Sequence, residues 1–299
     1  MNPFKIEKIL VPIDFSETSM LAFEYAIFAA KLLKAELVLL HVIENHWEKF
    51  NIVVPELRVN APNDIIDAID ARLEEIASNI LSTHGIKSTC ITSSGVIFSE
   101  IITEAKEQNV DLIIMGTHGN SGFSESFIGS NTFKVTTSSA CPVISVHTHS
   151  QKTGFNEILL PIDDSSHSLQ KVNHAVILAK HFSSRIQLVG LSDFEDELNI
   201  QKFEIKLLEI EAYIKKSGLV SARKIIAGKN KATMVADYAK IIGADLIIIM
   251  TDQDENISGQ FMGAYAQQIV NNSKIPVFSI RAAEGSIFTL EDFPSIENQ

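Results

Sequence analysis

The sequence is poor in cysteine, in tryptophan and in long apolar runs. Its 299 residues include two cysteines, Cys90 and Cys141, too few for a disulfide framework and without C-x-x-C spacing. Each is expected to be a small buried hydrophobic residue. No apolar run has the length needed to span a bilayer, and residues 1–5 show no apolar leader. These features predict a cytoplasmic protein that does not enter a membrane.

Basic residues are also scarce. Lys and Arg number 25 against 37 Asp and Glu, which gives a formal net charge of −12. This balance argues against nucleic acid and anionic membrane surfaces as partners. A nucleotide remains compatible with it, because a local cradle of backbone dipoles can hold an anion on an acidic protein. The scattered histidines show no metal-ligand spacing, so no metal site is predicted. No catalytic residue is predicted either.

Two common phosphate-binding signatures are absent. Neither the Walker string G-x4-G-K-[ST] nor the dinucleotide fingerprint G-x-G-x-x-G occurs. Instead, an apolar strand over 111–114 leads through a loop into a helix, with G-x2-G-x9-G-S spacing made by Gly116, Gly119, Gly129 and Ser130. Glycines let a backbone approach a ligand, and a helix N-terminus offers amides to an anion. We interpret this stretch as a phosphate cradle; the alternative is that the glycines serve only turns.

The glycine spacing resembles the nucleotide signature of the universal stress protein family, in its ATP-binding branch. The resemblance implies ATP as the ligand, with or without Mg²⁺. It implies that Asp14 accepts hydrogen bonds from the ribose hydroxyls, with Pro12 and Ile13 beside the adenosine. It also implies that Val42 contacts adenine, largely through main-chain groups.

Further candidates flank the glycine loop. Met115 precedes the loop and could lie against the base, and His118 sits between two loop glycines and could donate to a phosphate. Asn131 and Thr132 stand at the expected helix start, where they could add amides and a hydroxyl.

Two of the polar residues at strand ends have other interpretations. Asp14 could cap the following helix, because Glu17 stands three residues later as in a capping box. His41 lies in a buried run and is expected to be a satisfied core residue.

Apolar runs alternate with helical periodicity along the chain. Strands are expected over 8–14, 37–43, 87–93, 111–114 and 142–146, and helices over 20–33, 62–83, 96–108 and 131–138. Such alternation predicts an α/β fold with a doubly wound parallel sheet.

The second half repeats the first. Residues 158–163 mirror 9–14, and residues 244–249 mirror 110–115. We therefore expect two tandem Rossmann-like domains, of the adenine nucleotide alpha-hydrolase type by the resemblance, at 1–147 and 155–282, followed by an acidic tail at 283–299. The first half is longer by an irregular loop at 45–61. That loop holds Trp47 and could be a lid over the nucleotide or a contact with a partner domain or subunit.

The copy departs from the glycine pattern. Met250 replaces Gly116, Ala264 replaces Ser130, and the stretch 252–255 brings Asp252, Gln253, Asp254 and Glu255. Carboxylates there would repel phosphates, so the second half is predicted not to bind ATP through this loop. Alternatively, Met250 is a core residue on a shifted strand end.

Three functions are compatible with these patterns. The first is an ATP-binding, nucleotide-dependent stress-response or regulatory protein with one competent site in the N-terminal half. The second is a slow ATPase or an enzyme that transfers phosphoryl or adenylyl groups, and the third is an interaction scaffold with a vestigial site. No Lys or Arg lies between Met115 and Phe133, which favours binding over turnover.

Expectations about how the two halves and two chains assemble come from the resemblance alone. It implies that the two halves pack as a pseudo-two-fold pair through their last strands. Two chains could dimerise further.

Overall fold

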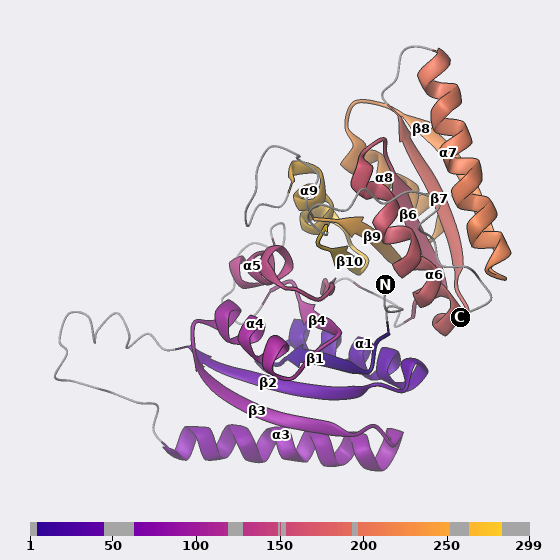
Figure 1. Cartoon of the computed structure of the whole chain (residues 1–299). Coiled ribbons are helices and arrows are strands. Elements are labelled where there is room, and N and C mark those ends of the chain that lie inside the picture. The colour runs from indigo at the N-terminus through magenta and orange to yellow at the C-terminus, as the bar shows by residue number, and fades with distance from the viewer. Residues whose placement is uncertain are drawn as a thin grey trace, which may run out of the picture. The chain divides into compact units, whose positions relative to one another are not determined.

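The structure is a computed structural model that describes residues 5–44, 63–118, 128–148, 150, 154–192, 197–251 and 263–282. These residues form two compact units, one from 5–118 and 129–148 and the other from 154–282. Gly119, the loop at 45–61, residues 252–255 and the tail at 283–299 lie outside the described residues. Figure 1 shows the elements of each unit.

The first unit alternates strands with helices. Its elements are β1 (Lys8–Pro12), α1 (Glu17–Leu33), β2 (Glu36–Glu44), α3 (Asn63–His84), β3 (Ser88–Gly95), α4 (Ile97–Glu107), β4 (Leu112–Gly116), α5 (Ser130–Ser138) and β5 (Val143–Val146). The strands lie in the order β3-β2-β1-β4-β5. Each of these neighbouring pairs is parallel, which confirms the predicted α/β class.

The second unit repeats this plan. Its elements are β6 (Glu157–Ile162), the 3₁₀ turn η1 (Ser166–Leu169), α6 (Gln170–Phe182), β7 (Arg185–Ser192), α7 (Glu197–Lys216), β8 (Ser221–Ala227), α8 (Lys231–Ile242), β9 (Leu246–Met250), α9 (Ala264–Asn272) and β10 (Val277–Ile280). The strand order β8-β7-β6-β9-β10 is the counterpart of the first. These pairs are also parallel.

Both faces of the first sheet are covered. One face packs against α4 and α5 in a core cluster that includes Leu10, Val38, Leu40, Ile101, Ala105, Ile113, Met115, Val135 and Val143. Strand residues between these positions, such as Ile9 and Leu37, are fully buried as well. Because successive strand side chains point to opposite faces, they pack on the side of α1 and α3. This double burial explains why the strands are continuous apolar runs.

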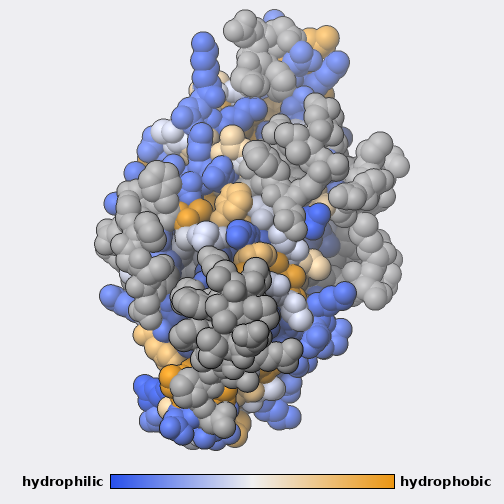
Figure 2. All heavy atoms as spheres, turned by 90° about the vertical axis from the view of Figure 1, so that its left-hand side faces the viewer, coloured by the Kyte–Doolittle hydropathy of each residue, from blue (hydrophilic) through white to orange (hydrophobic). Residues whose placement is uncertain are grey.

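On the side seen in Figure 2, described residues are mostly hydrophilic, and hydrophobic ones form small scattered patches. Among the described residues, no helix has both the length and the apolar character required to cross a bilayer.

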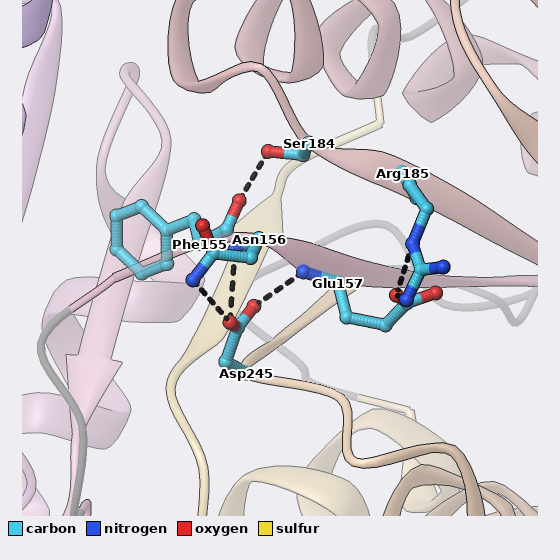
Figure 3. A network of polar contacts seen from close by, with 6 residues as sticks. All are labelled: Phe155, Asn156, Glu157, Ser184, Arg185 and Asp245. Carbon is cyan, nitrogen blue, oxygen red and sulfur yellow. Dashed lines mark hydrogen bonds and ion pairs between the residues drawn. The ribbon is translucent and has the colours of Figure 1, made fainter.

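In each unit, an aspartate carboxylate accepts hydrogen bonds from backbone amides at the start of the first strand. In the first, the amides of Glu7 and Lys8 donate to Asp111 Oδ2 at 2.8 and 2.9 Å. In the second, the amides of Asn156 and Glu157 donate to the Asp245 carboxylate at 2.8 and 2.9 Å (Figure 3). Each aspartate therefore fixes the first strand of its unit against the fourth.

Replacing Asp111 by alanine leaves two strand amides without their acceptor. We expect Asp111→Ala to lower the free energy of unfolding by about 1–3 kcal/mol. Asp245→Ala should do the same in the second unit. Urea titration followed by circular dichroism measures both.

The control is Asp237→Ala in α8. Asp237 is exposed, and its ion pair with Lys240 spans 3.8 Å, so the loss should stay within about 0.5 kcal/mol. A cost for Asp111→Ala no larger than that of Asp237→Ala would show that the carboxylate does not fasten the strand.

Candidate functional site

The strand order of each unit changes direction at its first strand. β1 lies between β2 and β4, and β6 lies between β7 and β9. In open parallel sheets, ligands bind in the crevice outside the carboxyl ends of the strands at such a point. Pro12 ends β1, Ile13 and Asp14 follow it, and Gly116 ends β4. The fold therefore brings these predicted residues to one edge of the sheet.

Asp14 shapes the turn between β1 and α1. Its Oδ1 accepts from Ser16 N at 3.0 Å, and its own amide donates to Ser19 Oγ at 3.4 Å. The alternative that Asp14 caps α1 is wrong. Ser16 is the N-cap, with its hydroxyl accepting from Ser19 N at 3.2 Å, so the helix begins at Glu17 rather than at the expected residue 20.

An aromatic pair lies beside Asp14. Phe15 has a φ of +61°, a left-handed conformation that costs a bulky residue about 1–3 kcal/mol. Its ring stacks on His41 with 5.3 Å between centroids. His41 Nδ1 donates to the carbonyl oxygen of Ile13 at 2.6 Å. His41 is therefore satisfied as expected, but it is half-buried at the strand end instead of belonging to the core.

Val42 and Met115 both pack into the core on the side of α4. Val42 is half-buried against the core cluster, and Met115 is a buried member of it. Contact of either residue with a base remains a prediction.

Gly116 has a packing reason to be glycine. A Cβ at this position would lie 2.9 Å from Thr18 Cγ2 and 3.1 Å from the Thr18 backbone. The expectation that the missing side chain leaves room for a ligand needs correction, because the first turn of α1 fills that space. A ligand contact to the Gly116 backbone stays a prediction.

Gly129 sets the entry into α5. Its amide donates to the Thr117 carbonyl at 2.8 Å, and a Cβ would lie 2.9 Å from the same oxygen. The first backbone hydrogen bond of the helix runs from Phe133 N to Gly129 O at 3.0 Å. The amides of Ser130, Asn131 and Thr132 therefore make no bond within the helix, and Gly129 at the N-cap has no side chain to cap them.

Thr132 plays a different part from the one predicted. Its hydroxyl donates to Gly116 O at 2.9 Å, and the residue is 3% exposed. The hydroxyl proton is therefore engaged inside the protein, and the expectation that it binds phosphate is corrected. The bond ties the first turn of α5 to the end of β4. Ser130 is exposed and Asn131 half-buried, so their side chains remain candidates.

His118 does not stand alone at the end of β4. Its Nδ1 lies 3.0 Å from Thr117 Oγ1, and Nδ1 of His147 lies 3.4 Å from the same hydroxyl. The two rings meet edge to face with centroids 6.3 Å apart. Sequence reasoning missed His147, which follows the last strand of the unit and is 6% exposed.

The second unit keeps the backbone of this turn. Gly263 N donates to Thr251 O at 3.0 Å, as Gly129 does to Thr117. Met250 pairs with Ile280 as Gly116 pairs with Val146, so the strand end is not shifted. Met250 is a fully buried core residue there. In the first unit, Thr18 fills the space beside Gly116, the residue that matches Met250.

A buried charge cluster surrounds Asp163, the counterpart of Asp14. Lys171 is 1% exposed, and burial lowers its pKa to about 8, although the charge of Asp163 opposes this shift. Burial alone would raise the pKa of the Asp163 carboxyl, but Lys171 and hydrogen bonds from Ser165 outweigh it and lower the pKa. Lys206 Nζ donates to the Asp163 carbonyl at 3.0 Å.

The position of Lys171 shows how the two units differ. In each unit, a serine hydroxyl accepts a hydrogen bond from the aspartate amide, Ser19 from Asp14 and Ser168 from Asp163. Three residues after that serine, the first unit has the fully buried Ala22 and the second has Lys171. The sequence signal that could have revealed this difference is a lysine on the apolar face of the helix that follows Asp163. Tyr265 takes the place of Asn131, and burial raises its pKa well above the ordinary value.

Comparisons with known proteins agree with the repeat. The Universal stress protein family matches this chain twice, over residues 5–147 and 154–281. Universal stress protein YxiE of Bacillus subtilis is 33% identical over 144 residues, covering 46% of this chain and 97% of that protein. Universal stress protein MJ0577 of Methanocaldococcus jannaschii is 34% identical over 154 residues, covering 47% of this chain and 94% of that protein.

A solved structure shares the fold along nearly the whole chain. The crystal structure of a universal stress protein from Archaeoglobus fulgidus has a TM-score of 0.72 at 21% identity, and the match covers 95% of this chain and 99% of that one. The two family matches show that the chain belongs to the universal stress protein family and carries its domain twice.

Proposed function

We propose that the first unit binds ATP at the crevice between β1 and β4, and that the protein acts as a nucleotide-dependent stress-response or regulatory protein. One observation carries the proposal. The first-turn amides of α5 make no bond within the helix, and the turn that presents them is held to the end of β4 by Gly129 and Thr132. Such amides and the helix dipole favour a polyphosphate.

The other groups at this edge fit a nucleoside. The Asp14 carboxylate is an acceptor of the kind that ribose hydroxyls require, and it lies half-buried at the end of β1. Pro12, Ile13 and Val42 would then lie on the adenosine side, with the Gly116 backbone, His118 and Ser130 on the phosphate side. Mg²⁺ would reach this edge with the nucleotide's phosphates.

The second unit offers the same amides with different surroundings. Asp163 is engaged by Lys171 and by Ser165, whose hydroxyl donates to its Oδ1 at 2.6 Å. Tyr265 stands where the first unit has Asn131. We therefore propose that this unit does not bind ATP, because the Ser165 hydroxyl and the buried Lys171 charge both act on its equivalent acceptor and its helix start carries a bulky ring.

The residues at the crevice between β1 and β4 favour ATP binding without efficient hydrolysis. No Lys or Arg occurs between Met115 and Phe133. The nearest cation along α5, Lys134, lies 4.4 Å from the centroid of the Phe98 ring. Phosphoryl transfer needs a cation that neutralises the charge developing on the transferred group. We propose that hydrolysis, if measurable, is slow.

A carboxylate at the first residue of α5 tests the phosphate position. Ser130 and Ala264 are both exposed first residues of their helices. Glutamate there suits the helix dipole, so folding should be retained. We expect Ser130→Glu to weaken ATP binding at least about tenfold by charge repulsion. Isothermal titration calorimetry on the full chain measures the dissociation constant.

Ala264→Glu is the matched control and should leave the dissociation constant within about twofold. Weakening by Ala264→Glu alone would place the nucleotide in the second unit. Weakening by neither variant would show that the phosphates do not lie at these helix starts.

Asp14→Asn tests the ribose contact. Asparagine can still accept from Ser16 N and so preserves the turn, but it is a weaker acceptor for hydroxyls. We expect ATP affinity to fall about tenfold, while 2′,3′-dideoxy-ATP binds the variant and the parent protein alike. An equal loss for both ligands would mean that Asp14 acts on something other than the ribose.

A further inference from the structure

The side of α7 that points away from its sheet carries a row of exposed apolar residues. Leu198, Ile205 and Leu208 are 61%, 56% and 49% exposed, and Ala212 is exposed as well. Helix residues separated by seven or three positions lie on one side, so these four residues form a single row. They are called the α7 strip below.

The core of the second unit does not use the α7 strip. α7 packs along β7 and β8 with its opposite side (Figure 1), whose buried residues are Phe203, Leu207, Ile210 and Ile214. A helix on the surface of a domain ordinarily places polar residues opposite its buried face. Within the described part of the chain, the packing of the second unit therefore gives no reason for the strip to be apolar.

The counterpart helix of the first unit has no such strip. α3 and α7 align by buried residues with the same spacing in both helices: Leu73, Ile76 and Ile80 match Leu207, Ile210 and Ile214. In this alignment, the exposed residues that match Leu198, Ile205 and Leu208 are Asp64, Ala71 and Glu74. The fold thus accepts charged and small residues at these positions, and the α7 strip is particular to the second unit.

The α7 strip can pair with a copy of itself. Its spacing is that of the contact positions of a coiled coil. When two copies of α7 lie antiparallel about a two-fold axis between Ile205 and Leu208, Ile205 of each copy meets Leu208 of the other. The pairing removes from water the side chains that a single copy exposes, which is favourable.

Charges on one flank of the strip favour the same pairing. Lys202 and Glu209 are both exposed and lie side by side with the strip on the same flank. In the antiparallel arrangement, Lys202 of each copy lies nearest Glu209 of the other. The two-fold axis therefore creates two pairs of opposite charge.

The other flank carries Glu204 and Glu211. In the same arrangement, Glu204 of each copy lies nearest Glu211 of the other. Within its own copy, Glu211 forms ion pairs with Lys215 at 2.8 Å and with Arg223 at 3.3 Å. These cations compensate its charge, so repulsion on this flank is weakened.

We propose that the α7 strip is a docking surface for α7 of a second copy of this chain, in an antiparallel two-fold pair. One helix face per copy makes a small contact, and small interfaces support weak association. We expect a dissociation constant on the order of 10 μM. The inference is independent of the proposed nucleotide site.

Sedimentation velocity on the full chain, from about 1 to about 200 μM, measures this association. Leu208→Glu introduces the residue that α3 carries at the matching position, so folding should be retained. We expect it to raise the dissociation constant at least about tenfold, because a carboxylate would be buried unpaired in both copies. Leu81→Glu, at a 55% exposed residue of α3, is the matched control and should leave the constant within about twofold.

Charge reversal tests the antiparallel pairing. Lys202→Glu and Glu209→Lys each bring like charges together twice, so each should weaken the association about fivefold. The double variant restores two opposite-charge pairs and should return the constant to within about twofold of the parent value.

Three results would overturn the inference. A chain that stays monomeric at every concentration has no such docking surface. If Leu208→Glu destabilises that monomer, the strip is covered by another segment of the same chain. Equal dissociation constants for the parent, Leu208→Glu and Leu81→Glu would place the association elsewhere, and additive losses in the double charge variant would show that Lys202 and Glu209 do not meet.

Discussion

The packing of α5 against the end of β4 is the constraint on which the candidate site depends. Gly129 N donates to Thr117 O, the Thr132 hydroxyl donates to Gly116 O, and Thr18 fills the space beside Gly116. These contacts leave little freedom in where the helix begins. The first-turn amides are therefore presented at the switch point of the sheet, which would limit the ordering cost of the proposed binding.

The two units share that scaffold and differ in what surrounds it. The bond from Gly263 N to Thr251 O repeats the first unit, but Ala266 has no hydroxyl to match Thr132. Lys171 and Asp163 bring buried charge to the place where the first unit has Ala22 and Asp14. The buried Lys171 charge helps to lower the pKa of the Asp163 carboxyl, and removing either charge would leave the other buried without that compensation. The second unit thus retains the fold, but Asp163, its counterpart of Asp14, interacts with Ser165 and Lys171 inside the protein.

Sequence patterns were sufficient for the fold and for bringing the candidate site residues to one edge of the sheet. Buried parallel strands are short apolar runs, and the repeated strand ends placed Asp14 and Gly116 correctly. The patterns did not reveal why Gly116 is glycine or what Thr132 binds. Both depend on contacts between segments distant in sequence, with Thr18 and the Gly116 carbonyl. His147 was missed for the same reason, since it meets His118 only once β4 and β5 pair.

We propose that this tandem chain has a single competent nucleotide site, in its first unit. Native mass spectrometry of the full chain with excess ATP counts the bound nucleotides directly. One ATP per chain is the predicted result. Two per chain would show that the Asp163 cluster does not close the second site, and none would show that the presented amides of α5 are not a nucleotide site.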